Sequence, residues 1–129
     1  MIVIKTLDGP DIDVNENAIV LVAGPYPHDV GPHTYVYGVT PGVLVTAEPA
    51  AALVGRLGVN PSLARLTRPN STPVWIKGAA ATYVRLPMDI EVKDPGQVNA
   101  VVGIGKLRQP VHEAVADARA IVNAHGGNV

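Results

Sequence analysis

The sequence predicts an α+β protein made of two tandem β-rich repeats, each with four to five short antiparallel strands followed by one helix. Hydrophobic residues make up 47% of the 129 residues and charged residues only 16%, which is typical of a chain with a folded core. The 13 glycines and 12 prolines indicate many turns between short strands. The same order of apolar runs and turns also occurs twice along the chain.

The two repeats are predicted to span residues 1–60 and 61–129. Each repeat alone is small enough for its core to be marginal, so we expect both to pack as one domain, residues 1–129, around a pseudo-twofold axis. The first aligned segment needs no gap, and the second follows a loop of different length. The aligned positions are Ile4 to Pro25 with Leu66 to Pro87, Thr34 to Val39 with Asn99 to Ile104, and Glu48 with Glu113.

The strands of each repeat follow from turn residues and apolar alternation. Asp8-Gly9 and Asn70-Ser71 each separate two short alternating runs, which predicts a hairpin at the start of each repeat. The third strands, residues 18–22 and 81–85, end near a proline that cannot donate to a strand ladder. A loop rich in Pro, Gly and Asp then leads to a fourth strand, and a glycine-containing turn leads to a short fifth strand.

One helix is expected to close each repeat. We expect the first to be capped by Thr46, to tolerate Pro49 in its opening turn and to stop at Gly58. The second is expected from about Glu113 to Ala124, with His125 at the negative end of the helix dipole. Its apolar residues share one face: Val115, Ala118, Ile121 and Val122.

The run Asp11 to Asn17 places carboxylates or amides at alternate positions, as a calcium loop does. Such a loop needs Gly at its sixth position and Glu at its twelfth, and this chain has Glu16 and Val22 there. The second repeat keeps the apolar alternation but not the potential ligands. We therefore predict a half-buried strand with Asp11, Asp13 and Asn15 facing solvent, and no metal site.

The sequence offers little for catalysis, and we expect no enzyme, no catalytic residues and no cofactor. The serines Ser62 and Ser71 lie in a linker and a turn, outside any nucleophile elbow. Residues 103–106 lack the spacing of a phosphate-binding loop. His28 and His33 share one loop, but their spacing matches no metal signature. A hydrolase or isomerase is the least supported class because no acid, base and nucleophile converge.

The net charge and the composition limit which binding partners and which cellular compartment we expect. A net charge of −1 supplies no general attraction to nucleic acid or anionic lipid, so neither is expected as the main partner. The absence of cysteine suits a reducing compartment. The N-terminal residues form no apolar run of signal-peptide length, and no segment approaches a membrane span. We expect a cytoplasmic protein.

The large aromatic side chains suggest where contacts occur. Trp75 in the second repeat aligns with Asp13 in the first, which predicts an outward position for its side chain. His33, Tyr35 and Tyr37 occupy alternate positions of one strand and so share a face. Arg85 belongs to a basic stretch near Trp75. These residues form a candidate contact surface between subunits or for a flat ligand, or they fill the space between the repeats.

Residues 64–125 resemble the small flagellar and swarming-motility proteins of the FlbD type. The matching residues are Leu66, Thr67, Arg68, Asn70 and Glu113. Ser71 replaces the glycine of that pattern, and Lys77-Gly78 replaces its asparagine region. The resemblance implies a small non-enzymatic accessory or assembly module, and it carries no catalytic residues.

Two functions follow as hypotheses. The first is a non-enzymatic interaction or assembly module that binds another copy of itself or another protein, since sheets of short repeats leave edges that pair readily. The alternative is a small-ligand or nucleotide binder with an aromatic and basic pocket between the repeats. The residues expected to line that pocket are His33, Tyr35, Tyr37, Trp75 and Arg85.

Overall fold

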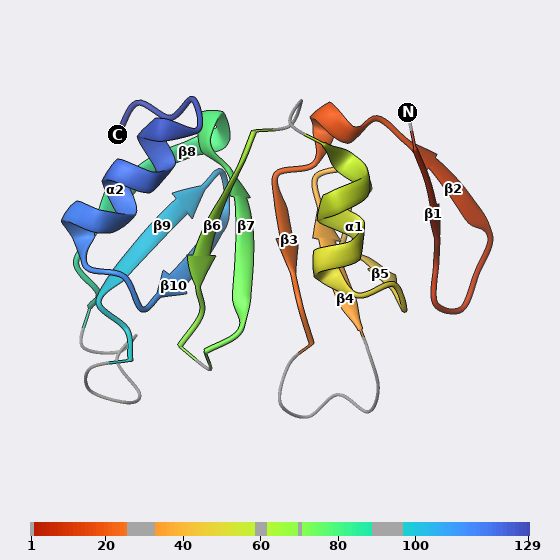
Figure 1. Ribbon diagram of the computed structural model, residues 1–129, viewed down its shortest axis with the longest axis horizontal. Helices are drawn as coiled ribbons and strands as arrows, with labels where there is room; N and C mark the ends of the chain where they lie inside the picture. Colours follow the sequence, from red (N-terminus) through yellow and green to blue (C-terminus); the bar gives the residue numbers. More distant parts are fainter. Residues whose placement is uncertain (1, 26–32, 59–61, 70, 89–96) are drawn as a thin grey trace. The chain divides into compact units, whose positions relative to one another are not determined.

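The structure is a computed structural model that describes residues 2–25, 33–58, 62–69, 71–88 and 97–129 (Figure 1). Contacts divide the chain into two compact units, Met1–Pro61 and Ser62–Val129, which we call unit 1 and unit 2. His28 and Asn70, which the sequence analysis considered for a metal site and a turn, lie outside the described residues.

Unit 1 begins with a hairpin and continues with a three-stranded antiparallel meander. Within the hairpin β1 pairs with β2, and within the meander β4 pairs with both β3 and β5. The helix α1 contacts β3. The elements of unit 1 are β1 (Ile2–Lys5), β2 (Asp11–Val14), the 3₁₀ turn η1 (Glu16–Ala18), β3 (Leu21–Ala23), β4 (Thr34–Tyr37), β5 (Leu44–Thr46) and α1 (Ala50–Leu57).

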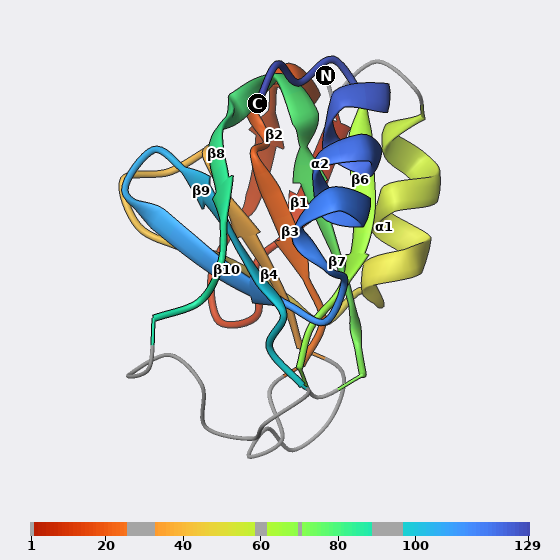
Figure 2. The same ribbon diagram turned by 90° about the vertical axis from the view of Figure 1, so that its left-hand side faces the viewer.

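Unit 2 repeats this order. The strand β6 pairs with β7, and β9 pairs with both β8 and β10, all antiparallel. The helix α2 contacts β6, β8 and β9, and Figure 2 shows it running along these strands. The elements of unit 2 are β6 (Leu63–Thr67), β7 (Pro73–Lys77), the 3₁₀ turn η2 (Gly78–Ala80), β8 (Ala81–Arg85), β9 (Ala100–Ile104), β10 (Leu107–Val111) and α2 (Val115–Ala124).

The predicted α+β class is confirmed. Within the described residues, each unit has a hairpin, a 3₁₀ turn, three further antiparallel strands and a closing helix, in that order. Apolar residues at matching places form the two cores because alternate strand residues point to the same side. Those of unit 1 include Ile4, Val14, Val22, Val36 and Leu53, and those of unit 2 include Leu66, Ile76, Val84, Val101 and Ala118.

The run that resembled a calcium loop begins as a strand, as predicted, and ends in a 3₁₀ turn. In β2 the side chains of Asp11 and Asp13 are exposed while Val14 is buried. The Asn15 side chain accepts a hydrogen bond from the Asn17 N–H at 3.0 Å and so begins the turn η1. Among the described residues, no group of three or more His, Asp or Glu side chains is close enough to hold a metal ion.

The helix starts differ from the predictions. Thr46 does not cap α1, because it lies four residues before Ala50, and the residue preceding the helix is Pro49 in an extended conformation. The Thr46 Oγ1 instead accepts the Glu48 N–H at 3.3 Å, in the connection before the helix. The predicted stop at Gly58 is confirmed, since its φ of +70° favours glycine.

The start of the second helix was placed two residues too early. The residue Glu113 precedes α2, which begins at Val115, because Ala114 has an extended backbone and the Glu113 side chain bonds elsewhere. The predicted end is confirmed, since His125 directly follows Ala124 and its Nδ1 lies 2.9 Å from the Ile121 carbonyl oxygen. The predicted buried face includes Ala118 and Val122.

Candidate binding cleft in unit 1

Trp75 does not stand outward as predicted. Only 8% of its surface is exposed, and its neighbours Val74 and Ile76 are also buried. Three consecutive buried residues mean that both faces of β7 are covered. The matching strand β2 has one exposed face, so transferring its pattern to β7 gave the wrong exposure for Trp75.

His33, Tyr35 and Tyr37 share one half-buried face at β4, as their alternation predicted, with Thr34 and Val36 buried on the other. Two of the three, His33 and Tyr35, line a cavity of about 590 Å³. Its other lining residues are Thr6, Leu7, Asp8, Gly9, Ile12, Thr40, Val43, Leu44 and Val45. All belong to unit 1.

Arg85, the last predicted contact residue, lies at the end of β8. Its guanidinium lies over the ring of Tyr83, with the central carbon 5.6 Å from the ring centroid, and its Nη1 donates to the Leu86 carbonyl oxygen at 3.0 Å. Three of the five predicted site residues therefore belong to unit 1, and Trp75 and Arg85 belong to unit 2. A pocket shared by all five stays a prediction.

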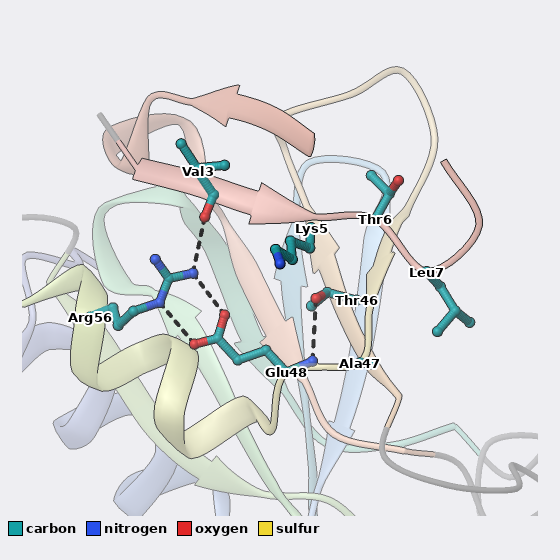
Figure 3. Close-up of a pocket in the computed structure, with 8 residues that line it drawn as sticks. All are labelled: Val3, Lys5, Thr6, Leu7, Thr46, Ala47, Glu48 and Arg56. Carbon is teal, nitrogen blue, oxygen red and sulfur yellow. Dashed lines mark hydrogen bonds and ion pairs between the residues drawn. The ribbon is translucent and has the colours of Figure 1, made fainter. Parts of the chain in front are cut away.

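A second cavity of about 590 Å³ in unit 1 was not predicted from the sequence (Figure 3). We call it the β1 cleft, because strand β1 and the residues just after it form one wall and the connection from β5 to α1 forms the other. Its lining residues are Val3, Lys5, Thr6, Leu7, Thr46, Ala47, Glu48 and Arg56. It shares Thr6 and Leu7 with the cavity at His33 and Tyr35.

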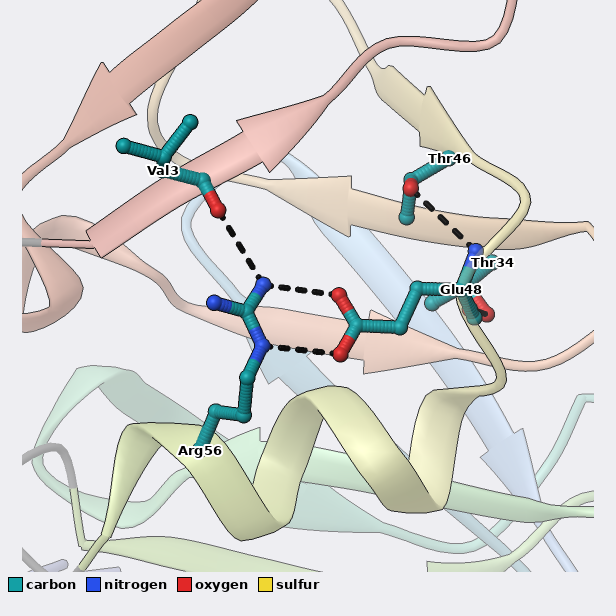
Figure 4. Close-up of polar contacts among 5 residues, drawn as sticks. All are labelled: Val3, Thr34, Thr46, Glu48 and Arg56. Atoms are coloured by element: carbon teal, nitrogen blue, oxygen red, sulfur yellow. Dashed lines mark hydrogen bonds and ion pairs between the residues drawn. The ribbon is translucent and has the colours of Figure 1, made fainter.

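An ion pair fixes one side of the β1 cleft (Figure 4). The Arg56 Nε and Nη2 donate to the two carboxylate oxygens of Glu48 at 2.8 and 2.7 Å, and Nη2 also donates to the Val3 carbonyl oxygen at 3.1 Å. The hydrogen bonds with Glu48 raise the pKa of Arg56 above its usual range. Arg56 thereby ties the helix α1 to both Glu48 and β1.

The main chain of Glu48 is held by two buried threonines. The Thr34 Oγ1 donates to the Glu48 carbonyl oxygen at 2.5 Å, and the Thr46 Oγ1 accepts the Glu48 N–H at 3.3 Å. Both threonines are 1% exposed, so these bonds are sheltered from water. The position of Glu48 is therefore set by the fold, and only the direction of its carboxylate is set by Arg56.

The matching place in unit 2 is closed by direct hydrogen bonds. Thr67 ends β6 as Lys5 ends β1, and Glu113 lies two residues before α2 as Glu48 lies two residues before α1. The Thr67 N–H donates to Glu113 Oε1 at 2.9 Å, and its carbonyl oxygen accepts the His112 N–H at 2.8 Å. The glutamate of unit 2 thus joins the first strand directly, whereas Glu48 turns to the helix.

Glu48 and Glu113 bond to different partners because the helices α1 and α2 differ in sequence. Arg56 and Ile121 each occupy the seventh residue of their helix. The isoleucine offers no cation, so Glu113 is left to bond the strand. Comparing the two repeats at this position could have revealed the cleft from the sequence.

Unit 1 also exposes large apolar side chains near the cleft. Val3, Leu7 and Val43 are exposed at 47%, 40% and 43%. The residues at the corresponding places of unit 2 are Arg65, Pro69 and Arg108. Val3 and Leu7 line the β1 cleft, and Leu7 and Val43 line the cavity at His33 and Tyr35, so we call these three residues the apolar patch of unit 1.

Comparison with models of protein families, with curated proteins and with solved structures finds no match for this chain. The resemblance to FlbD-type proteins therefore stays a prediction. Among the described residues, no helix has the length and apolar character needed to cross a membrane.

Proposed function

We propose that the chain is a non-enzymatic interaction module that assembles with another copy of itself through unit 1. The observation that carries this proposal is the apolar patch of Val3, Leu7 and Val43, each at least 40% exposed. Exposed apolar groups that gather on one surface mark contacts with a partner, because burying them there is favourable.

The second unit supports this interpretation. Its counterparts of Val3 and Val43 in the alignment of the repeats are the arginines Arg65 and Arg108. Val3 lies in β1 and Arg65 in β6, while Val43 directly precedes β5 and Arg108 lies at the start of β10. The fold therefore does not need an apolar side chain at either position. The patch gives unit 1 an apolar surface in contact with water. Contact with an apolar surface of a second copy would bury it.

The test is the mass of the particle in solution. Light scattering coupled to size exclusion should give a dimer or larger particle for the natural chain, and the double variant Val3→Arg, Val43→Arg should shift it to the monomer. The control is Leu86→Arg, which changes an even more exposed apolar residue, at 73%, in unit 2. A natural chain that stays monomeric at every concentration would refute self-assembly.

A small-ligand binder remains the second candidate, favoured by the cavity at His33 and Tyr35. An aromatic ring and an imidazole beside an apolar wall suit a flat ligand such as a nucleotide base.

A melting experiment tests this candidate. A ligand present at about 100 times its dissociation constant adds about 2.7 kcal/mol to the free energy of unfolding. Adenine and guanine nucleotides should raise the melting temperature of the natural chain but not of Tyr35→Ala, with Tyr83→Ala as the control. The absence of any shift would remove this candidate.

A further inference from the structure

In unit 2, the place that corresponds to the β1 cleft is occupied by a carboxylate of the chain itself, the side chain of Glu113. There the Glu113 side chain accepts the main-chain N–H of Thr67 at the end of β6. In unit 1 the corresponding N–H belongs to Lys5, at the end of β1. The Glu48 carboxylate accepts two hydrogen bonds from Arg56 instead.

The direction of the Lys5 main chain follows from its neighbours. The Val3 carbonyl oxygen accepts a bond from Arg56, and the Leu7 N–H donates to the Val45 carbonyl oxygen at 2.9 Å. Alternate residues of a strand direct their N–H and C=O groups to the same edge. Lys5, between Val3 and Leu7, therefore presents its main-chain groups to the cleft.

The charges of the cleft favour an anion. Lys5 and Arg56 line it with two positive charges, and Glu48 contributes one negative charge that Arg56 already pairs. The Lys5 side chain lies between β1 and Thr46 in Figure 3. An incoming carboxylate would meet an ammonium group and a main-chain N–H, and bonds from such donors are stronger than those between neutral groups.

The remaining walls favour an apolar body on that anion. Val3 and Leu7 line the cleft and are exposed at 47% and 40%, with Ala47 on the opposite wall. A ligand that covers them removes apolar surface from water. A bare inorganic anion would leave this surface uncovered.

We propose that the β1 cleft binds an organic monocarboxylate. Its carboxylate takes the place that Glu113 has in unit 2, at the Lys5 N–H and ammonium group, and its apolar body lies against Val3 and Leu7. The acid is either a small molecule or the C-terminal residue of a partner chain. This site does not need self-assembly, because all of its residues belong to one chain. Since both proposals use Val3 and Leu7, the acid would bind the monomer and compete with a second copy for these side chains.

The binding test uses two pairs of probes on the full chain, followed through the amide signals of Lys5 and Ala47 by nuclear magnetic resonance. The first pair is 4-methylpentanoate and 4-methylpentanamide, and the second is an acetylated tripeptide ending in leucine with a free or an amidated C-terminus. At least one of the two acids should shift these signals at concentrations of about 10 mM or below, and its amide should not. A response to the peptide acid alone identifies a chain terminus as the ligand, and a response to the free acid identifies a small molecule.

Two variants take the residues of unit 2. Lys5→Thr should weaken binding of the acid by about tenfold through the loss of one charged donor, whereas the control Lys106→Thr, an exposed lysine in unit 2, should leave it unchanged. Arg56→Ile should abolish binding, because Glu48 is then released to accept the Lys5 N–H as Glu113 accepts that of Thr67. A dispersed amide spectrum establishes that each variant is folded.

A third variant should act in the opposite direction. Glu48→Gln removes the negative charge from the cleft, so it should strengthen binding of the acid and leave the amide unaffected. The proposal is overturned if neither acid shifts the Lys5 and Ala47 signals, if acid and amide bind equally, or if Lys5→Thr and Lys106→Thr weaken binding to the same degree.

Discussion

At the scale of single residues, two glutamates at matching places bond to different partners. Glu113 bonds the main chain of Thr67 directly, in a partly buried setting. Glu48 pairs with Arg56, whose side chain is 43% exposed, against 24% for Glu48 itself. Water screens an exposed pair, so the two carboxylates should contribute unequally to stability.

We therefore expect Glu113→Ala to lower the free energy of unfolding by about 1–2 kcal/mol, because the Thr67 N–H loses a charged acceptor. Glu48→Ala should cost about 1 kcal/mol or less, the usual range for an exposed ion pair. Urea denaturation of both variants and the natural chain measures the difference. A loss for Glu48→Ala that equals or exceeds the loss for Glu113→Ala would contradict this ranking.

At the scale of elements, the turn η2 and the end of α2 are in close contact. A Cβ atom on Gly78 would overlap the carbonyl oxygens of Val122 and His125. The side-chain hydroxyl of Ser62 also donates to the His125 carbonyl oxygen, at 3.1 Å. The end of the second helix is thus seated on a backbone that has room only for glycine.

Gly78→Ala should lower the free energy of unfolding by about 1–3 kcal/mol, because neither carbonyl can move without disturbing the helix end. The matched control is Gly55→Ala in α1, where an added Cβ meets nothing within 4 Å. That change should stabilise the chain by about 0.5–1 kcal/mol, since alanine favours a helix. Thermal denaturation reports both changes, and equal effects of the same sign would contradict this explanation.

At the scale of the whole molecule, one order of elements serves both units. The apolar alternation and the turn residues were enough to predict both hairpins, the later strands and the closing helices, because these patterns depend on local geometry. Contacts divide the chain between Pro61 and Ser62, and the predicted packing of repeats 1–60 and 61–129 as one domain stays a prediction.

The binding features were harder to predict, for a physical reason. Burial of Trp75 depends on what covers β7, and no local pattern contains that information. The β1 cleft is open because the Glu48 carboxylate bonds to Arg56, eight residues later in the chain, and not to the main chain of β1. Pattern alone placed the glutamates in matching positions but could not give the direction of their carboxylates.

The position of Arg56 links the cleft to the order of the helix that carries it. Arg56 is the second-to-last residue of α1, which has only eight residues, and helices this short are marginal in isolation. Unwinding of its last turn would release Glu48 and let its carboxylate compete for the Lys5 N–H. An acid bound in the cleft would oppose that competition, so binding of the acid would also stabilise the last turn of α1 at Arg56.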